Sequence, residues 1–128
     1  MKNSLSIKSE NWPEVTEKPH YIVEAIYEGF SYVHSDIYFD DVNKIITELK
    51  SLEQNRKGRI ELDGGFRFKL IIEAGTLGGC LVKFRYESDE AFPGKLILDG
   101  RFPIEGEYTA SMVDMLFKLF TDGNEFVI

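Results

Sequence analysis

The sequence predicts an α+β fold, in which an antiparallel sheet of about six to seven strands is covered by two helices at about residues 40–54 and 109–122. Apolar and polar residues alternate in several short runs, whereas two longer segments repeat apolar residues about every 3.6 positions. The strands follow one another directly instead of alternating with helices, which favours antiparallel pairing. With 128 residues, 43% of them hydrophobic, we expect residues 1–128 to form a single domain.

The first half of the chain predicts a hairpin followed by a helix. A short alternating run from Leu5 to Ile7 is typical of an edge strand, and the strands 20–27 and 30–39 are joined by a tight Glu28-Gly29 turn. In 30–39 the alternation places Val33 and Ile37 on the same face. The helical period then begins, and Asp40 or Asp41 can cap the first free N–H groups of helix 40–54.

The second half predicts four strands and a closing helix. The strands cover 59–62, 66–73, 80–87 and 95–102, and glycine-rich or proline-containing turns separate them. Thr109 can cap the last helix, which Gly123 ends. The two helices each carry one apolar stripe, so both are expected to cover the sheet.

The net charge of −7, from 22 acidic and 15 basic residues, is unevenly distributed. Residues 1–54 hold 10 acidic and 5 basic side chains, 55–85 hold 3 and 7, and 86–128 hold 9 and 3. In the central strands the basic residues alternate with apolar ones, so they are expected to share one solvent-facing surface, suited to a small ligand or an anion. These residues are Arg59, Arg67, Lys69, Lys83 and Arg85.

The acidic flanks suggest a second kind of surface, because a negative patch attracts and orients a basic partner. One group lies where strand 30–39 meets the first helix, and the other follows strand 80–87. The candidate partner-binding residues are Asp36, Asp40, Asp41, Glu87, Asp89 and Glu90.

Catalytic and metal-binding patterns are not evident in the sequence. The only histidines are His20 and His34, the only cysteine is Cys80, and the glycines at 75–79 fit neither common phosphate-binding motif. His34 and Asp36 could orient an imidazole or hold a metal, but the pair also fits an ordinary polar strand face. We therefore expect no catalytic residue, no bound metal and no cofactor, with an enzyme built around His34 or Cys80 as a remaining alternative.

The compartment can be predicted from two features. A lone cysteine cannot form an internal disulfide, which favours a reducing environment. The chain shows neither a secretory signal pattern nor a run of 18 apolar residues, so we expect a cytoplasmic protein without membrane contact.

Five segments together resemble the WapI-like family of bacterial immunity proteins. They are FDDVNKIITELKSL at 39–52, GRIEL at 58–62, GFRFKL at 65–70, GGCLVKFRYE at 78–87 and MVDMLFKLF at 112–120. The resemblance implies a compact, non-enzymatic α+β protein that binds and neutralises the toxic domain of a polymorphic or contact-dependent toxin, often a nuclease. Its partner would be that cognate toxin domain rather than nucleic acid, and the protein would be a monomer or weak dimer. No active site is shared across such proteins, so the resemblance assigns no catalytic residue.

Overall fold

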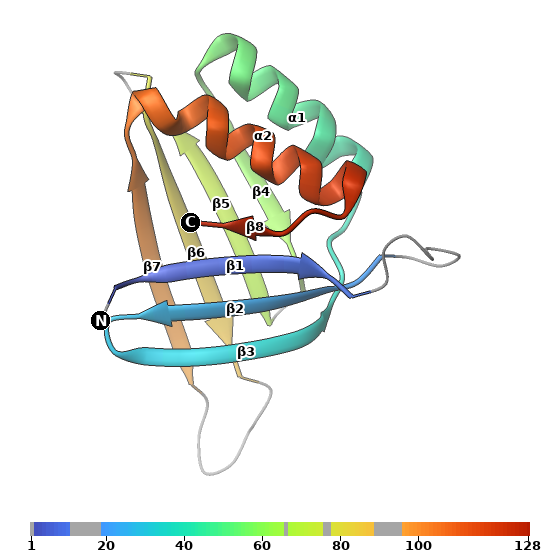
Figure 1. The fold of residues 1–128 in the computed structure, drawn as a ribbon, viewed down its shortest axis with the longest axis vertical. Helices are drawn as coiled ribbons and strands as arrows, with labels where there is room; N and C mark the ends of the chain where they lie inside the picture. Colours follow the sequence, from blue (N-terminus) through green and yellow to red (C-terminus); the bar gives the residue numbers. More distant parts are fainter. Residues whose placement is uncertain (1, 11–18, 66, 76–77, 89–95) are drawn as a thin grey trace. The chain divides into compact units, whose positions relative to one another are not determined.

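The computed structural model describes residues 2–10, 19–65, 67–75, 78–88 and 96–128. Within these residues the chain is an α+β protein with two helices and antiparallel strands, as predicted (Figure 1). The strands form two sheets of four each, whereas the sequence led us to expect one sheet of six to seven. Alternation within a strand shows which residues face inward, but it carries no information about which other strand is the hydrogen-bonded neighbour.

The chain divides into two compact units, and the first comprises Met1–Tyr38 and Ser111–Ile128. Its sheet has the order β3-β2-β1-β8 with antiparallel pairing throughout. The turn between β2 and β3 uses Glu28 and Gly29, both at positive φ (50° and 84°), as a two-residue hairpin requires. The strands are β1 (Ser4–Ser9), β2 (Tyr21–Tyr27), β3 (Phe30–Ile37) and β8 (Phe126–Val127). Strand β8, with two residues, is too short to show any period in the sequence.

Strand β3 contains a β-bulge that shifts its alternation. Val23 pairs with His34 but Tyr21 pairs with Ile37, so β3 has one more residue than β2 across this step. The expected shared face of Val33 and Ile37 is therefore wrong: Val33 is 57% exposed, whereas Ile37 is buried. A bulge depends on the partner strand, so the alternation of β3 alone could not reveal it.

The second unit, Phe39–Ala110, holds the other sheet, with the order β4-β5-β6-β7. Helix α1 packs beside β4, and both are drawn in green in Figure 1. Helix α2 (Gly106–Asp122) begins in this unit, and the boundary between the units falls within it, after Ala110. The other elements are α1 (Val42–Asn55), β4 (Arg59–Asp63), β5 (Phe68–Ala74), β6 (Cys80–Glu87) and β7 (Ile97–Ile104).

The first residues of the two helices agree with one predicted cap and differ from the other. The side chain of Asp41 caps α1 by accepting the N–H of Lys44 at 3.1 Å, so this residue, and not Asp40, is the cap. Helix α2 begins at Gly106, three residues before the expected cap Thr109. The Thr109 hydroxyl instead donates to the carbonyl of Gly78 at 2.9 Å. This bond joins α2 to a loop residue 31 positions earlier in the sequence, and Thr109 itself is buried.

Each unit has its own set of buried apolar side chains. In the first unit these are Leu5, Ile7, Tyr21, Val23, Ala25, Tyr32, Ile37, Met112, Val113, Leu116, Leu119, Phe120 and Phe126. In the second they are Phe39, Ile45, Leu49, Leu52, Ile60, Leu62, Phe68, Leu70, Ile72, Cys80, Val82 and Phe84. The stripes predicted for the two helices supply part of each set.

Neither helix in the described part of the chain is long and apolar enough to cross a membrane.

Candidate functional site: an acidic cleft beside α1

A cleft of about 400 Å³ lies in the second unit, where the beginning of α1 meets β4. Its walls are almost entirely charged, with a single apolar residue, Ile45, among the described residues that line it. The lining residues are Asp40, Asp41, Lys44, Ile45, Glu48, Arg59, Glu61 and Asp63. This volume falls within the range of ligand-binding pockets, but the usual apolar lining is absent from its described walls.

Backbone contacts fix the acidic residues at the edge of this cleft. The N–H of Asp40 donates to the carbonyl of Asp63 at 3.1 Å, which ties the approach to α1 to the end of β4. Asp41 has a positive φ of 50° and is held there by its capping bond. The carboxylate of Asp63 accepts the N–H of Gly65 at 2.9 Å and so closes the turn after β4. The carboxylates of Asp41 and Asp63 are therefore held by backbone N–H groups, and the backbone of Asp40 is held by β4.

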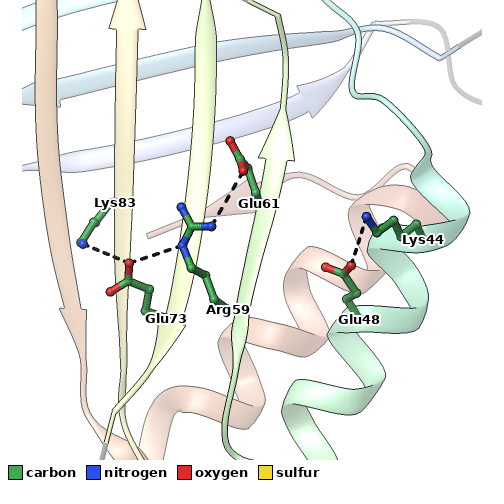
Figure 2. Close-up of polar contacts among 6 residues, drawn as sticks. All are labelled: Lys44, Glu48, Arg59, Glu61, Glu73 and Lys83. Atoms are coloured by element: carbon green, nitrogen blue, oxygen red, sulfur yellow. Dashed lines mark hydrogen bonds and ion pairs between the residues drawn. The ribbon is translucent and has the colours of Figure 1, made fainter.

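The cations in the cleft only partly compensate this negative charge. Lys44 lies 3.8 Å from Glu48, and Arg59 lies 3.9 Å from Glu61, both longer than a hydrogen bond and both exposed to solvent (Figure 2). Among the described residues that line the cleft, five carboxylates face two cations. Because the surplus sits between two walls of low dielectric, its field is concentrated in the cleft.

The structure separates the acidic residues that the sequence grouped together. Asp40 and Asp41 line the cleft, but Asp36 belongs to the first unit, where it lies beside His20. Glu87 ends β6 and its side chain is only 16% exposed, in an ion pair with Arg85 at 3.2 Å. Asp89 and Glu90 lie outside the described residues.

The five basic residues proposed for anion binding fall in or next to the second sheet. Arg59 lies on β4, Lys69 on β5, and Lys83 and Arg85 on β6, while Arg67 directly precedes β5. Acidic residues on the same strands face solvent on the same side of the sheet. The register brings these acidic residues next to the basic ones on neighbouring strands. These acidic residues are Glu61, Asp63, Glu73, Glu87 and Asp99.

Glu73 is the clearest case of this compensation. Its carboxylate lies 3.0 Å from Nζ of Lys83 and 3.6 Å from Nε of Arg59, and so joins β4, β5 and β6 (Figure 2). This face is thus of mixed charge rather than uniformly cationic, which weakens the argument for an anion site. Counting the charges of residues 55–85 could not reveal this mixture. Glu87 and Asp99 lie beyond residue 85 in the sequence but beside Arg85 in the sheet.

Cys80 is buried at the start of β6, with 6% of its surface exposed. Burial raises the pKa of its thiol, while the Thr109 hydroxyl and the charge of Arg56 act in the opposite direction. A thiol that is buried and protonated at neutral pH is a poor nucleophile, so its environment suits packing better than catalysis.

The sequence-based prediction of site residues missed three carboxylates of the cleft, Glu48, Glu61 and Asp63, together with Lys44 and Ile45. A signal for Glu48 was available, because Asp41, Lys44 and Glu48 recur at helical spacing and so share one side of α1. No comparable signal existed for Glu61 and Asp63, because β4 and the segment before α1 are separated in the sequence by the whole of α1.

Comparison of the chain with protein-family models, with curated proteins and with solved structures finds no match in any of the three. The resemblance to the WapI-like family therefore stays a prediction.

Proposed function

We propose that this chain is a non-enzymatic immunity protein, which acts in the cytoplasm of the producing cell and neutralises a cognate toxin domain by binding it at the acidic cleft. One observation carries the proposal. The cleft holds a surplus of carboxylates, with Asp40 and Asp41 at its edge and Glu61 on its β4 wall, and backbone bonds hold the Asp41 carboxylate and the Asp40 main chain in place.

The charge of the cleft suits a partner that normally binds polyanions. A nuclease domain must present a cationic surface to hold phosphates, so a negative cleft competes for the same basic side chains. Complementary potential also accelerates encounter and fixes the orientation of the complex. This matters for an immunity protein, which must capture its toxin before the toxin reaches its substrate.

The shape of the cleft suits side chains of a protein. Its charged walls offer little to an apolar ligand, whereas an arginine from a partner can bond bidentately to a carboxylate. Arginine is also among the residues that contribute most to binding at protein interfaces. We therefore expect the toxin domain to insert an arginine or lysine between α1 and β4.

The test is growth rescue. A candidate toxin domain from a neighbouring gene is expressed from an inducible promoter, with and without this chain, and the complex is isolated by affinity purification. The charge-reversal variant Asp40→Lys/Glu61→Lys changes two exposed residues of the cleft. The matched control, Asp122→Lys/Glu125→Lys, makes the same change in net charge at exposed residues of the first unit.

The cleft variant is expected to lose rescue and to bind the toxin at least about tenfold more weakly, with most of the loss in the association rate. The control should rescue like the wild type. Full rescue by the folded cleft variant would place the interface elsewhere. Failure of the wild-type chain to bind or rescue would reject the immunity function itself.

A further inference from the structure

Three side chains that could serve as metal ligands converge in the first unit, separately from the acidic cleft. Glu10 follows β1, His20 precedes β2, and Asp36 lies near the end of β3. One ligand atom from each lies within 4.8 Å of the other two. Nδ1 of His20 is 3.2 Å from Oε1 of Glu10 and 3.5 Å from Oδ1 of Asp36.

The pairing of β1 with β2 brings two of these residues together. Ser9 pairs with Tyr21, and the N–H of the following Glu10 donates to the carbonyl of His20 at 3.0 Å. Glu10 and His20 therefore lie opposite each other at the end of an antiparallel ladder. The Glu10 and His20 side chains are 20% and 26% exposed, and Glu10 taken as a whole residue is exposed, so the pair lies at the surface in contact with solvent.

The bulge in β3 supplies the third residue. Asp36 has a positive φ of 56°, which is uncommon for a residue other than glycine, and its N–H donates to Oε1 of Glu10 at 2.8 Å. Bulges can redirect a side chain out of the regular alternation of a strand. Here the redirected carboxylate lies beside the imidazole of His20.

The donor set and its spacing fit a divalent transition metal. In a tetrahedral site with bonds of about 2.1 Å, two ligand atoms lie roughly 3.4 Å apart, and both distances from Nδ1 are close to this value. An imidazole nitrogen with two carboxylate oxygens suits zinc and its neighbours, whereas calcium and magnesium prefer oxygen ligands alone. The Asp36 side chain is 65% exposed, so water has access to the remaining coordination position.

We propose that Glu10, His20 and Asp36 form a binding site for one divalent transition metal ion, with zinc as the ion that fits best. The site is independent of the function proposed for the cleft, because all its ligands belong to the first unit.

The test uses the untagged 128-residue chain, since a histidine tag would itself bind metal. Zn²⁺ is titrated by calorimetry, and Co²⁺ is titrated by visible absorption, which reports the coordination geometry. We expect one ion per chain and a rise in the melting temperature with Zn²⁺. His20→Gln and Asp36→Asn should each weaken binding at least about tenfold, because even the loss of an outer-shell partner has an effect of this size.

His34→Gln is the matched control, since His34 is the other histidine of the chain and lies on β3 outside the cluster. It should bind Zn²⁺ like the wild type. In NMR spectra of the wild-type protein, the ring signals of His20 should shift on adding Zn²⁺ while those of His34 stay in place, which tests the site without any variant. Absence of Zn²⁺ binding below millimolar concentration, or binding that His20→Gln leaves unchanged, would overturn the proposal.

Discussion

The two faces of the sheet β4-β5-β6-β7 are built from the same strands but have opposite characters. On the inner face the central positions are uniformly apolar and at most 2% exposed: Ile60, Leu62, Leu70, Ile72, Val82 and Phe84. On the outer face acidic and basic side chains are interleaved, and they compensate each other through pairs such as Lys83 with Glu73. Where β4 borders the cleft, carboxylates outnumber cations among the described lining residues.

This difference shows that burial and recognition follow different rules. The inner face depends only on whether each residue is apolar, which alternation along a strand specifies. The outer face depends on which charges become neighbours, and the register decides that. A basic segment in sequence is therefore not necessarily a basic surface, as the position of Glu73 between Arg59 and Lys83 illustrates.

The largest effect is expected on the inner face. Leu62→Ala removes a fully buried side chain from β4 and leaves a cavity, so it should lower the free energy of unfolding by about 2–5 kcal/mol. Urea denaturation followed by circular dichroism measures this change. Leu62→Met, which keeps the volume, should cost less than about 1.5 kcal/mol. Equal effects of the two substitutions would show that packing on this face is not the main contribution of Leu62.

An intermediate effect is expected at the edge of the cleft. Asp41→Ala removes the cap of α1, and alanine tolerates the positive φ poorly, so the free energy of unfolding should fall by about 1 kcal/mol or somewhat more. Asp41→Asn retains a capping oxygen and tolerates this φ, so its stability should stay within about 0.5 kcal/mol of the wild type. The same denaturation experiment compares the two. A loss of stability in Asp41→Asn as large as in Asp41→Ala would indicate that charge, rather than capping, is the stabilising feature.

A smaller change in stability but a new binding property is expected at Glu73. Glu73→Gln removes the charge shared by Arg59 and Lys83, and should lower the free energy of unfolding by about 0.5–1 kcal/mol. Glu73→Lys should in addition create the cationic surface that the wild type lacks, and with it salt-sensitive binding of a single-stranded oligonucleotide. Fluorescence anisotropy at two salt concentrations tests this. If the wild type and Glu73→Lys bind the oligonucleotide equally, compensation by Glu73 does not control this face.

The smallest effect is expected for the pair of Arg59 with Glu61. The two groups are 3.9 Å apart and 53% and 41% exposed, so solvent screens their attraction. Glu61→Gln should change the free energy of unfolding by less than about 0.5 kcal/mol. The same variant should nevertheless slow association with the cationic toxin domain, measured by surface plasmon resonance at low salt. A destabilisation above 1 kcal/mol would show that Glu61 supports the fold rather than the charge of the cleft.

Local sequence patterns predict both helices, most of the strands and most of the inward-facing residues, Val33 being an exception. These features depend on neighbours a few positions apart: the 3.6-residue stripe of Ile45, Leu49 and Leu52, the Asp41 cap, and the alternation of β5 and β6. Asp40 and Asp41 could be singled out for the same reason, since they precede a recognisable helix.

The division of the strands into two sheets, the pairing of opposite charges and the position of the Asp36 side chain all depend on tertiary contacts. The bond from Asp36 to Glu10 joins residues 26 positions apart, and the bond from Asp40 to Asp63 joins the segment before α1 to the last residue of β4. Periodicity describes the direction of a side chain relative to its own strand or helix. It does not specify the partner on the other side, because that partner is selected by pairing and packing across the whole unit.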